Sequence, residues 1–334
     1  EKAVQKIFKK LVEKGGIYKH SYEGLYCTGC ECFLNPKDLT EDGLCPDHLK
    51  KPEVVSEENY FFKLTKYKDA IIKHIKDNPD FIVPSFRANE VLNQLEDIQD
   101  ISVSRAKSNV QWGIDVLDDE EQSIYVWIDA LSNYITALGY DTENNSEDFI
   151  KYWPADVQVI GKDILKFHSI YWPAFLMALD LPLPKHILAH GWITIDETKM
   201  SKSLGNVVNP DDVVKAYGAD TMRLYIMFIG DFEKVATWSD EAVKGSKRFL
   251  DRCWNLMDMA ADSEELSEKN EAIIHKTIRK VTQDIDELKM NTAIAALMTM
   301  VNEFYANGLT KGDLKMLMLM LSPFAPHMVE EMWE

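Results

Sequence analysis

The spacing of apolar residues predicts an α/β region in the first part of the chain. Residues 1–13 alternate charged and apolar positions at helical spacing, and the glycines at 15–16 end that helix. Three short runs rich in β-branched residues predict buried parallel strands at 124–128, 157–160 and 186–189. Helical patterns over 130–138 and 163–179 separate them. This alternation favours a doubly wound α/β sheet whose ligand lies at the carboxyl ends of the strands.

After about residue 211 the chain is almost wholly helical in pattern. Apolar side chains recur every three or four residues over 283–305, which predicts one buried stripe. The Met-rich run LKMLMLML (314–321) can be imagined as a cofactor box, but Met routinely fills helical cores, so we favour a bundle core. Residues 53–110 combine a helix around 67–76 with an extended, Pro-punctuated stretch.

Composition narrows the class of protein without naming a function. The chain has 334 residues, 46% of them hydrophobic and 28% charged, which is typical of a globular protein of two or three domains. No run approaches the roughly 18 apolar residues of a membrane span, and the first residues lack a signal-peptide core, so we expect a cytoplasmic protein without a membrane partner. The net charge of −18 argues mildly against nucleic acid, although local basic patches decide such binding. Both ends look cut, since the chain starts at Glu1 and stops inside a helical pattern.

Four of the five cysteines lie in the turn-rich segment 21–52, which is too small to hold a core without a staple. Cys27-x2-Cys30 and Cys45-x2-His48 form two close pairs, the spacing of a structural zinc knuckle. Cys32 is the alternative fourth ligand, and pair symmetry favours His48. Because four ligands leave no open position, the predicted Zn²⁺ is structural, and it can supply on the order of 10 kcal/mol to folding.

The loop Lys199-Met200-Ser201-Lys202-Ser203 sets two ammonium groups beside small hydroxyls and a following glycine, and such a loop can approach polyphosphate. A solvated surface loop is the plain alternative for most such pentapeptides. KMSKS, however, is a signature of class I aminoacyl-tRNA synthetases, and the chain resembles that family. Up to about residue 210 it resembles the methionyl members, through the knuckle, YVWIDALSNY (125–134), GKDILKFHSIYWP (161–173) and AHGW (189–192).

The resemblance implies a set of site residues. A methionine pocket would be lined by Trp127, Ala130, Tyr134, Ile164, Phe167, His168 and Trp172, with Asp163 binding the α-amino group. ATP would contact His190, Gly191, Lys199 and Lys202, and both lysines would be catalytic. Arg105, in ISVSR, resembles an arginine beside the active site. The residues agree with this assignment, because a carboxylate pairs with an ammonium and aromatic walls suit a thioether. A satisfied core histidine at His168, and plain core roles for Trp127 and Trp172, are the alternatives.

After about residue 210 the sequence resembles the helical tRNA-binding domain of leucyl-tRNA synthetases. The stretches that carry this are WSDEAVKGSKRFLDRCWNL, MNTAIAALM and LSPFAPHMVEEMWE. No anticodon-reading residue follows from it. Lys244, Lys247, Arg248 and Arg252 fall on one helix there; they can meet phosphates, but we favour a solvated face.

Together, pattern and resemblance predict a class I synthetase fold: an incomplete Rossmann-like parallel sheet with a zinc-knuckle insertion and a C-terminal helical bundle. We expect the end of a first catalytic half at 1–20, a connective insertion at 21–120, the second catalytic half at 121–198, the KMSKS loop with a stem-contact region at 199–228, and a truncated anticodon-binding-type helical domain at 229–334.

The implied activity is that of a methionine–tRNA ligase, with ATP, Mg²⁺, L-methionine and tRNA(Met) as partners and no DNA. The family's second ATP motif, His-x-Gly-His, is absent, so we expect a fragment with little activity of its own. Two alternatives stay open. One is a leucyl-tRNA synthetase, supported by the helical end. The other is a binding module that holds tRNA or a protein without chemistry.

Overall fold

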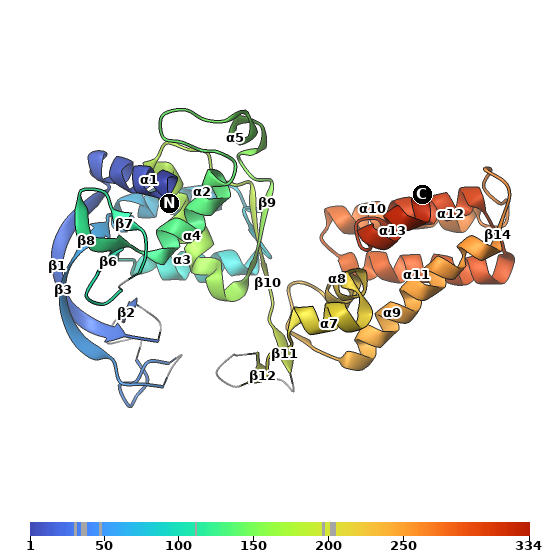
Figure 1. The fold of residues 1–334 in the computed structure, drawn as a ribbon, viewed down its shortest axis with the longest axis horizontal. Coiled ribbons are helices and arrows are strands. Elements are labelled where there is room, and N and C mark those ends of the chain that lie inside the picture. Colours follow the sequence, from blue (N-terminus) through green and yellow to red (C-terminus); the bar gives the residue numbers. More distant parts are fainter. Residues whose placement is uncertain (30–31, 35–38, 47–48, 111, 196–197, 201–204) are drawn as a thin grey trace. The chain divides into compact units, whose positions relative to one another are not determined.

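The computed structural model describes residues 1–29, 32–34, 39–46, 49–110, 112–195, 198–200 and 205–334 (Figure 1). They form two compact units, Glu1–Ala189 and His190–Glu334. Among the described residues, none of the helices has both the length and the apolar character that a membrane crossing needs.

The first unit mixes short strands with helices. Its helices are α1 (Lys2–Glu13), α2 (Lys68–Asp77), α3 (Phe86–Glu96), α4 (Val126–Thr136), α5 (Glu147–Tyr152) and α6 (Trp172–Ala178). Its strands are β1 (Ile17–Cys27), β2 (Cys32–Leu34), β3 (Glu53–Phe62), β4 (Ile82–Val83), β5 (Ile101–Ser102), β6 (Ser104–Ala106), β7 (Asp115–Val116), β8 (Asp119–Ile124), β9 (Val157–Gly161) and β10 (His186–His190).

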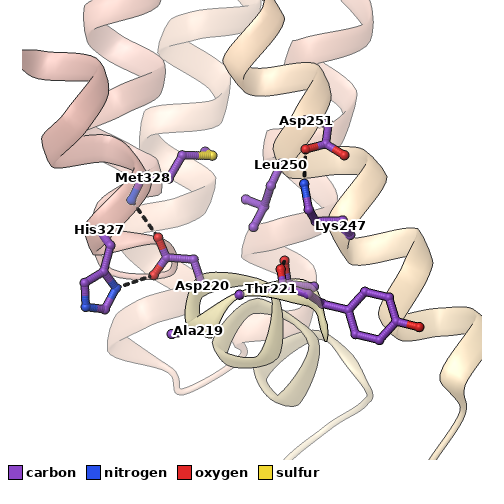
Figure 2. Close-up of a pocket in the computed structure, with 10 residues that line it drawn as sticks. Ala219, Asp220, Thr221, Lys247, Leu250, Asp251, His327 and Met328 are labelled. Carbon is purple, nitrogen blue, oxygen red and sulfur yellow. Dashed lines mark hydrogen bonds and ion pairs between the residues drawn. The ribbon is translucent and has the colours of Figure 1, made fainter. Parts of the chain in front are cut away.

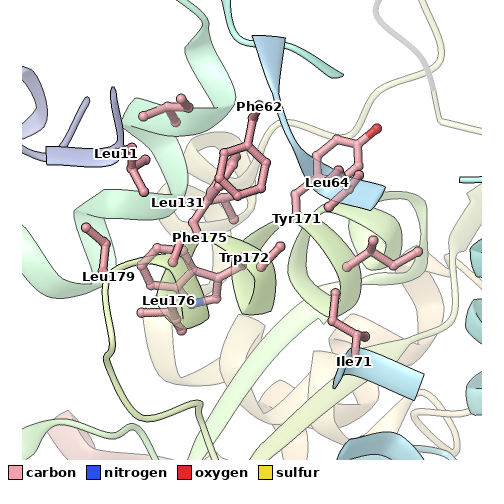
Figure 3. Close-up of a cluster of buried hydrophobic side chains, with 14 of the residues drawn as sticks. Leu11, Phe62, Leu64, Ile71, Leu131, Tyr171, Trp172, Phe175, Leu176 and Leu179 are labelled. Carbon is pink, nitrogen blue, oxygen red and sulfur yellow. The ribbon is translucent and has the colours of Figure 1, made fainter. Parts of the chain in front are cut away.

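Helix α1 confirms the first predicted helix. Its buried side chains Val4, Ile7, Phe8 and Leu11 recur at helical spacing, and Gly15 follows its end with a φ of 68°, a conformation that favours glycine. Leu11 belongs to the core of this unit, in which α6 is apolar throughout and buried except for the partly buried Met177 (Figure 3).

The predicted strands at 157–160 and 186–189 exist as β9 and β10, neighbours in a sheet whose third strand is β4. The expected burial is wrong for β9, because Val157 and Val159 are exposed and only alternate residues of this strand are buried. The predicted strand at 124–128 is wrong. Strand β8 ends at Ile124 in a different sheet, of order β6-β8-β7, and α4 begins at Val126. The reason is that Ile128, Leu131 and Ile135 are all buried and share one face only in a helix.

The predicted helix at 163–179 exists but is irregular. It opens with a 3₁₀ turn at Lys162–Ile164, widens to a π turn at Phe167–Tyr171, and continues as α6. Pro173 has no backbone N–H to give to the carbonyl of residue 169, and its ring would crowd that carbonyl in a regular helix, so the wider turn accommodates it.

The cysteine-bearing segment extends from a long antiparallel ribbon. Strands β1 and β3 pair from Ile17↔Phe62 to Tyr26↔Glu53, and the short strand β2 pairs with the far end of β1. Figure 1 shows this ribbon curving along the first unit. The described part of 21–52 is therefore supported by the paired strands β1 and β3.

The second unit is mainly helical, as predicted. Its helices are α7 (Pro210–Tyr217), α8 (Ala219–Phe228), α9 (Asp240–Asn255), α10 (Glu271–Asp286), α11 (Met290–Asn307), α12 (Lys311–Leu321) and α13 (Pro326–Trp333). Its strands are β11 (Ile193–Ile195), β12 (Thr198–Lys199), β13 (Ala236–Thr237), β14 (Ala260–Ala261) and β15 (Leu309–Thr310).

The apolar stripe predicted over 283–305 belongs to two helices instead of one. Helix α10 ends at Asp286, Leu288 adopts a φ of 58°, and α11 begins at Met290. The buried carboxylate of Asp284 explains the break, because it accepts hydrogen bonds from the Lys280 ammonium (2.6 Å) and from the Thr292 hydroxyl (2.6 Å) in the next helix. The Met-rich run lies in α12, where Leu317, Met318 and Leu321 are buried in the bundle core, so the core interpretation is confirmed.

Candidate functional site

Two helical segments of the first unit bring five of the eight predicted methionine-pocket residues together. Trp127 and Phe167 stack with ring centroids 3.8 Å apart and an interplanar angle of 13°. Tyr134 meets the His168 ring edge-on at 5.6 Å and lies 6.2 Å from the Trp172 ring. The π turn matters here, because it carries Phe167 and His168 to the same neighbours on α4.

A hydrogen-bonded pair of neutral side chains lies at the centre of this cluster. His168 Nδ1 donates to the Ile164 carbonyl at 3.0 Å, which leaves Nε2 to accept from the Tyr134 hydroxyl at 2.9 Å. His168 is only 3% exposed, and burial lowers its pKa. Burial also raises the pKa of the Tyr134 hydroxyl. Both groups therefore stay uncharged near neutral pH, an environment that suits an uncharged thioether better than an ion.

The other predicted pocket residues lie on the same two segments. Ala130 is exposed on α4, and its spacing of three and four residues from Trp127 and Tyr134 puts it on their face of the helix. Ile164 is partly buried beside the cluster. Asp163 is exposed in the turn that follows β9, at the carboxyl end of a strand of the sheet, where ligands of such folds bind.

Two of the predicted residues are also core or scaffold residues. Trp172 is fully buried and contacts Trp153 edge-on at 5.9 Å, so the plain core role holds for part of its surface. Arg105 is buried on β6, where its guanidinium donates to Ser102 Oγ at 3.0 Å and lies 4.3 Å from the ring of Tyr125. Because Tyr125 directly precedes α4, Arg105 helps to fix the start of that helix.

The predicted ATP residues belong to the second unit. His190 Nδ1 donates to the carbonyl of Gly191 at 2.7 Å. The Gly191 N–H donates to the Phe232 carbonyl at 2.7 Å, and a Cβ at this glycine would lie 2.1 Å from the Lys234 carbonyl oxygen. Lys199 is on β12, and Lys202 lies outside the described residues.

Two of the four predicted zinc ligands are described. Cys27, at the end of β1, and Cys45 are buried, whereas Cys30 and His48 lie outside the described residues. In the part of the chain that the structure covers, no three His, Cys, Asp or Glu side chains gather as a metal site requires. The fifth cysteine, Cys253, is buried in the helical core, and burial raises its pKa to about 12, which keeps it a thiol without a metal role.

The basic run on α9 is largely engaged within the protein. Lys244 pairs with Glu241 at 2.7 Å, Lys247 pairs with Asp251, and the Arg252 guanidinium lies over the ring of Tyr305. These contacts favour the solvated-face interpretation of the run.

Sequence reasoning missed Asp220, which borders a hollow of about 280 Å³ in the second unit (Figure 2). Its buried carboxylate accepts from His327 Nδ1 at 2.8 Å and from the Met328 N–H at 2.6 Å, and thereby caps α13. None of the residues predicted to bind methionine, ATP or zinc lines this hollow, whereas Lys247 of the basic run on α9 does. The cap joins Asp220 to residues that lie 107 and 108 positions further along the chain, so nothing local in the sequence signals it.

Comparison with known proteins adds the family. The sequence model described as "tRNA synthetases class I (M)" matches residues 1–51 and 48–257, and that of the "anticodon-binding domain of tRNA ligase" matches 271–334. The methionine–tRNA ligase of Clostridium acetobutylicum is 54% identical over 228 residues, which are 68% of this chain and 35% of that protein. The Clostridium perfringens enzyme is 47% identical over 302 residues, 88% of this chain and 45% of that protein. The chain thus spans about a third to a half of these relatives, and the similarity extends well past residue 210.

Solved structures of aminoacyl-tRNA synthetases also match the chain. A Mycobacterium tuberculosis methionyl-tRNA synthetase bound by methionyl-adenylate matches 99% of this chain and 74% of its own, with a TM-score of 0.82 and 29% identity. An Agrobacterium radiobacter leucyl-tRNA synthetase complex matches with a TM-score of 0.76 at 16% identity and shares the fold alone. With these matches, the chain belongs to the class I tRNA synthetases (M), the methionyl-tRNA synthetase family.

Proposed function

We propose that this chain works in a methionine–tRNA ligase, which joins L-methionine to ATP as methionyl-adenylate and passes the methionyl group to tRNA(Met). Family membership supports the reaction class. The observation that carries the choice of methionine is the neutral Tyr134–His168 pair beside the stacked Trp127 and Phe167 rings. Such a cluster offers polarizable faces and no fixed charge to a flexible apolar side chain.

The aromatic cluster holds the methionine side chain in this proposal, together with Ala130, Ile164 and Trp172. Asp163 pairs with the substrate's α-ammonium. Its exposed position in the turn after β9 supports this role, because the carboxylate stays hydrated until the substrate binds. Discrimination against leucine rests on shape and sulfur–ring contact, and one methylene is worth about 1–3 kcal/mol.

His190, Gly191, Lys199 and Lys202 bind ATP, whose triphosphate carries Mg²⁺. The methionine carboxylate attacks the α-phosphorus, the bond to the β-phosphate oxygen breaks, and pyrophosphate leaves. No side chain becomes a covalent intermediate, so catalysis is orientation plus stabilisation of negative charge on phosphate oxygens. Lys202 stabilises the transition state, and Lys199 shares the charge. Lys202→Ala should therefore slow adenylate formation by about a hundredfold, roughly 3 kcal/mol, with methionine binding nearly intact.

A structural Zn²⁺ bound by Cys27, Cys30, Cys45 and His48 is part of the proposal. The donor set fits the metal, because two buried thiols at Cys27 and Cys45 lie in a segment that supplies few apolar side chains to the core. A metal would supply the stability that this segment lacks. The helical part from residue 229 onward, which contains the anticodon-binding match, contacts tRNA in this proposal.

Methionine-dependent exchange of pyrophosphate into ATP tests the function, in a polypeptide of the relatives' length that contains residues 1–334. We expect exchange with methionine and much less with leucine. Equal or faster exchange with leucine supports a leucyl-tRNA synthetase instead. Absence of exchange with either amino acid, with tRNA binding retained, supports a binding module and contradicts the proposal.

A further inference from the structure

Lys199 belongs to a small sheet of the second unit, whose strand order is β12-β11-β13. Across this sheet, Thr194 of β11 is the partner of Lys199 on one side and of Thr237 on the other. Within the described residues, strand β12 consists of two residues and pairs with β11. The backbone of Lys199 is therefore placed by β11, and in particular by the position of Thr194.

The side chain of Thr194 bonds β11 to β13. Thr194 is 4% exposed, its Oγ1 donates to the Ala236 carbonyl at 3.3 Å, and it lies 3.3 Å from the Thr237 hydroxyl. A backbone hydrogen bond adds to these side-chain contacts: the Trp238 N–H donates to the Thr194 carbonyl at 2.8 Å. Buried Thr194 and exposed Thr237 thus form a cross-strand pair, and such pairs stabilise the register of neighbouring strands.

Strand β13 is itself anchored to the helical part of the unit. The Ser239 N–H donates to the hydroxyl of Tyr225 at 2.8 Å, and the Trp238 ring meets the Tyr225 ring edge-on at 4.9 Å. Tyr225 is 1% exposed on α8. The contacts thus run without a gap from α8 through β13 and Thr194 to the strand of Lys199.

The start of β11 is held by backbone rather than by side chains. Gly191 gives its N–H to the Phe232 carbonyl, and there is no room for a Cβ against the Lys234 carbonyl. Residues 191–194 therefore lie against 232–238.

We propose that Thr194 is a positioning residue for Lys199. The inference rests on the proposed function for the role of Lys199. Thr194 touches no substrate in this scheme; it acts by fixing where β12 lies. Because catalysis by a lysine depends on its placement, a displacement of about 1 Å can cost up to about a hundredfold in rate.

The test compares Thr194→Val, which keeps the shape and removes the hydroxyl, with Thr194→Ser, which keeps the hydroxyl. Thr299→Val is the matched control, since Thr299 is exposed on α11 and its hydroxyl donates to the Ala295 carbonyl of its own helix. Two quantities are measured: the kinetics of methionine-dependent pyrophosphate exchange, and hydrogen exchange of the backbone amides of Thr198 and Lys199.

We expect Thr194→Val to lower kcat by about tenfold to a hundredfold, to leave the KM for methionine unchanged, and to speed amide exchange in β12. Thr194→Ser should restore both, and Thr299→Val should change neither. A normal kcat in Thr194→Val, or failure of Thr194→Ser to restore it, overturns the proposal. If the parent protein shows no methionine-dependent exchange, the proposed function fails; unchanged amide exchange in Thr194→Val then overturns the structural part of the inference as well.

Discussion

Replacing Tyr134 by Phe isolates one hydrogen bond of the proposed methionine pocket. The ring remains, and with it the edge-on contact with His168 and the contact with Trp172. Only the hydroxyl that donates to His168 Nε2 at 2.9 Å is lost. Since His168 is 3% exposed, its Nε2 is left buried without a donor, which costs about 1–3 kcal/mol. We expect the free energy of unfolding of the first unit to fall by that amount.

Urea unfolding and calorimetric titration with methionine measure this effect. Methionine affinity should fall by about tenfold, because about 1.4 kcal/mol corresponds to that factor. Tyr140→Phe is the control, since Tyr140 is also buried in the first unit and its hydroxyl makes no hydrogen bond within the described residues. If the two variants lose equal stability and equal affinity, the Tyr134–His168 bond has no special role and the pocket assignment is refuted.

The buried Tyr134–His168 pair also predicts that the free energy of unfolding depends on pH. Burial lowers the pKa of His168, and also that of His74, below the value of about 6.5 in the unfolded chain. The unfolded chain therefore binds more protons in this range, so these groups contribute stability above about pH 6.5 that is lost progressively as the pH falls toward their folded values. His168→Gln should flatten part of this acid loss in unfolding curves recorded between pH 7.5 and 5. An unchanged slope in that variant would contradict the buried, neutral assignment.

Three further predictions concern stability. Gly312→Ala should destabilise the second unit by about 1–3 kcal/mol, because a Cβ there lies 2.4 Å from the Glu264 carbonyl oxygen. Gly245→Ala, in the middle of α9, should stabilise by about 0.5–1 kcal/mol, because an added Cβ would make only an ordinary contact of 3.8 Å with the Arg248 guanidinium; thermal unfolding of both variants checks the pair. Metal analysis should find one Zn²⁺ per chain, lost together with stability in Cys27→Ser; full retention of metal in that variant would exclude Cys27 as a ligand.

Local patterns were sufficient where one face of an element decides its structure. The amphipathic spacing of residues 1–13 predicted α1, because burial of a single helical face leaves a clear period, and short runs of β-branched residues predicted β9 and β10. The same argument failed at 124–128 and at 283–305. A five-residue apolar run fits either a strand or a helix, and the break after Asp286 depends on a carboxylate shared with the following helix.

The sequence alone determined the family, through motifs such as the lysine loop and the aromatic stretches, and with it the residue types on which the proposed reaction depends. Tertiary structure alone decided how those residues are held. The Tyr134–His168 bond joins positions 34 apart, Thr194 meets Thr237 43 positions away, and Gly191 is required by a carbonyl at Lys234. Such contacts leave no periodic or compositional signal along the chain. They arise only when packing brings distant backbone and side-chain atoms within hydrogen-bonding or van der Waals range.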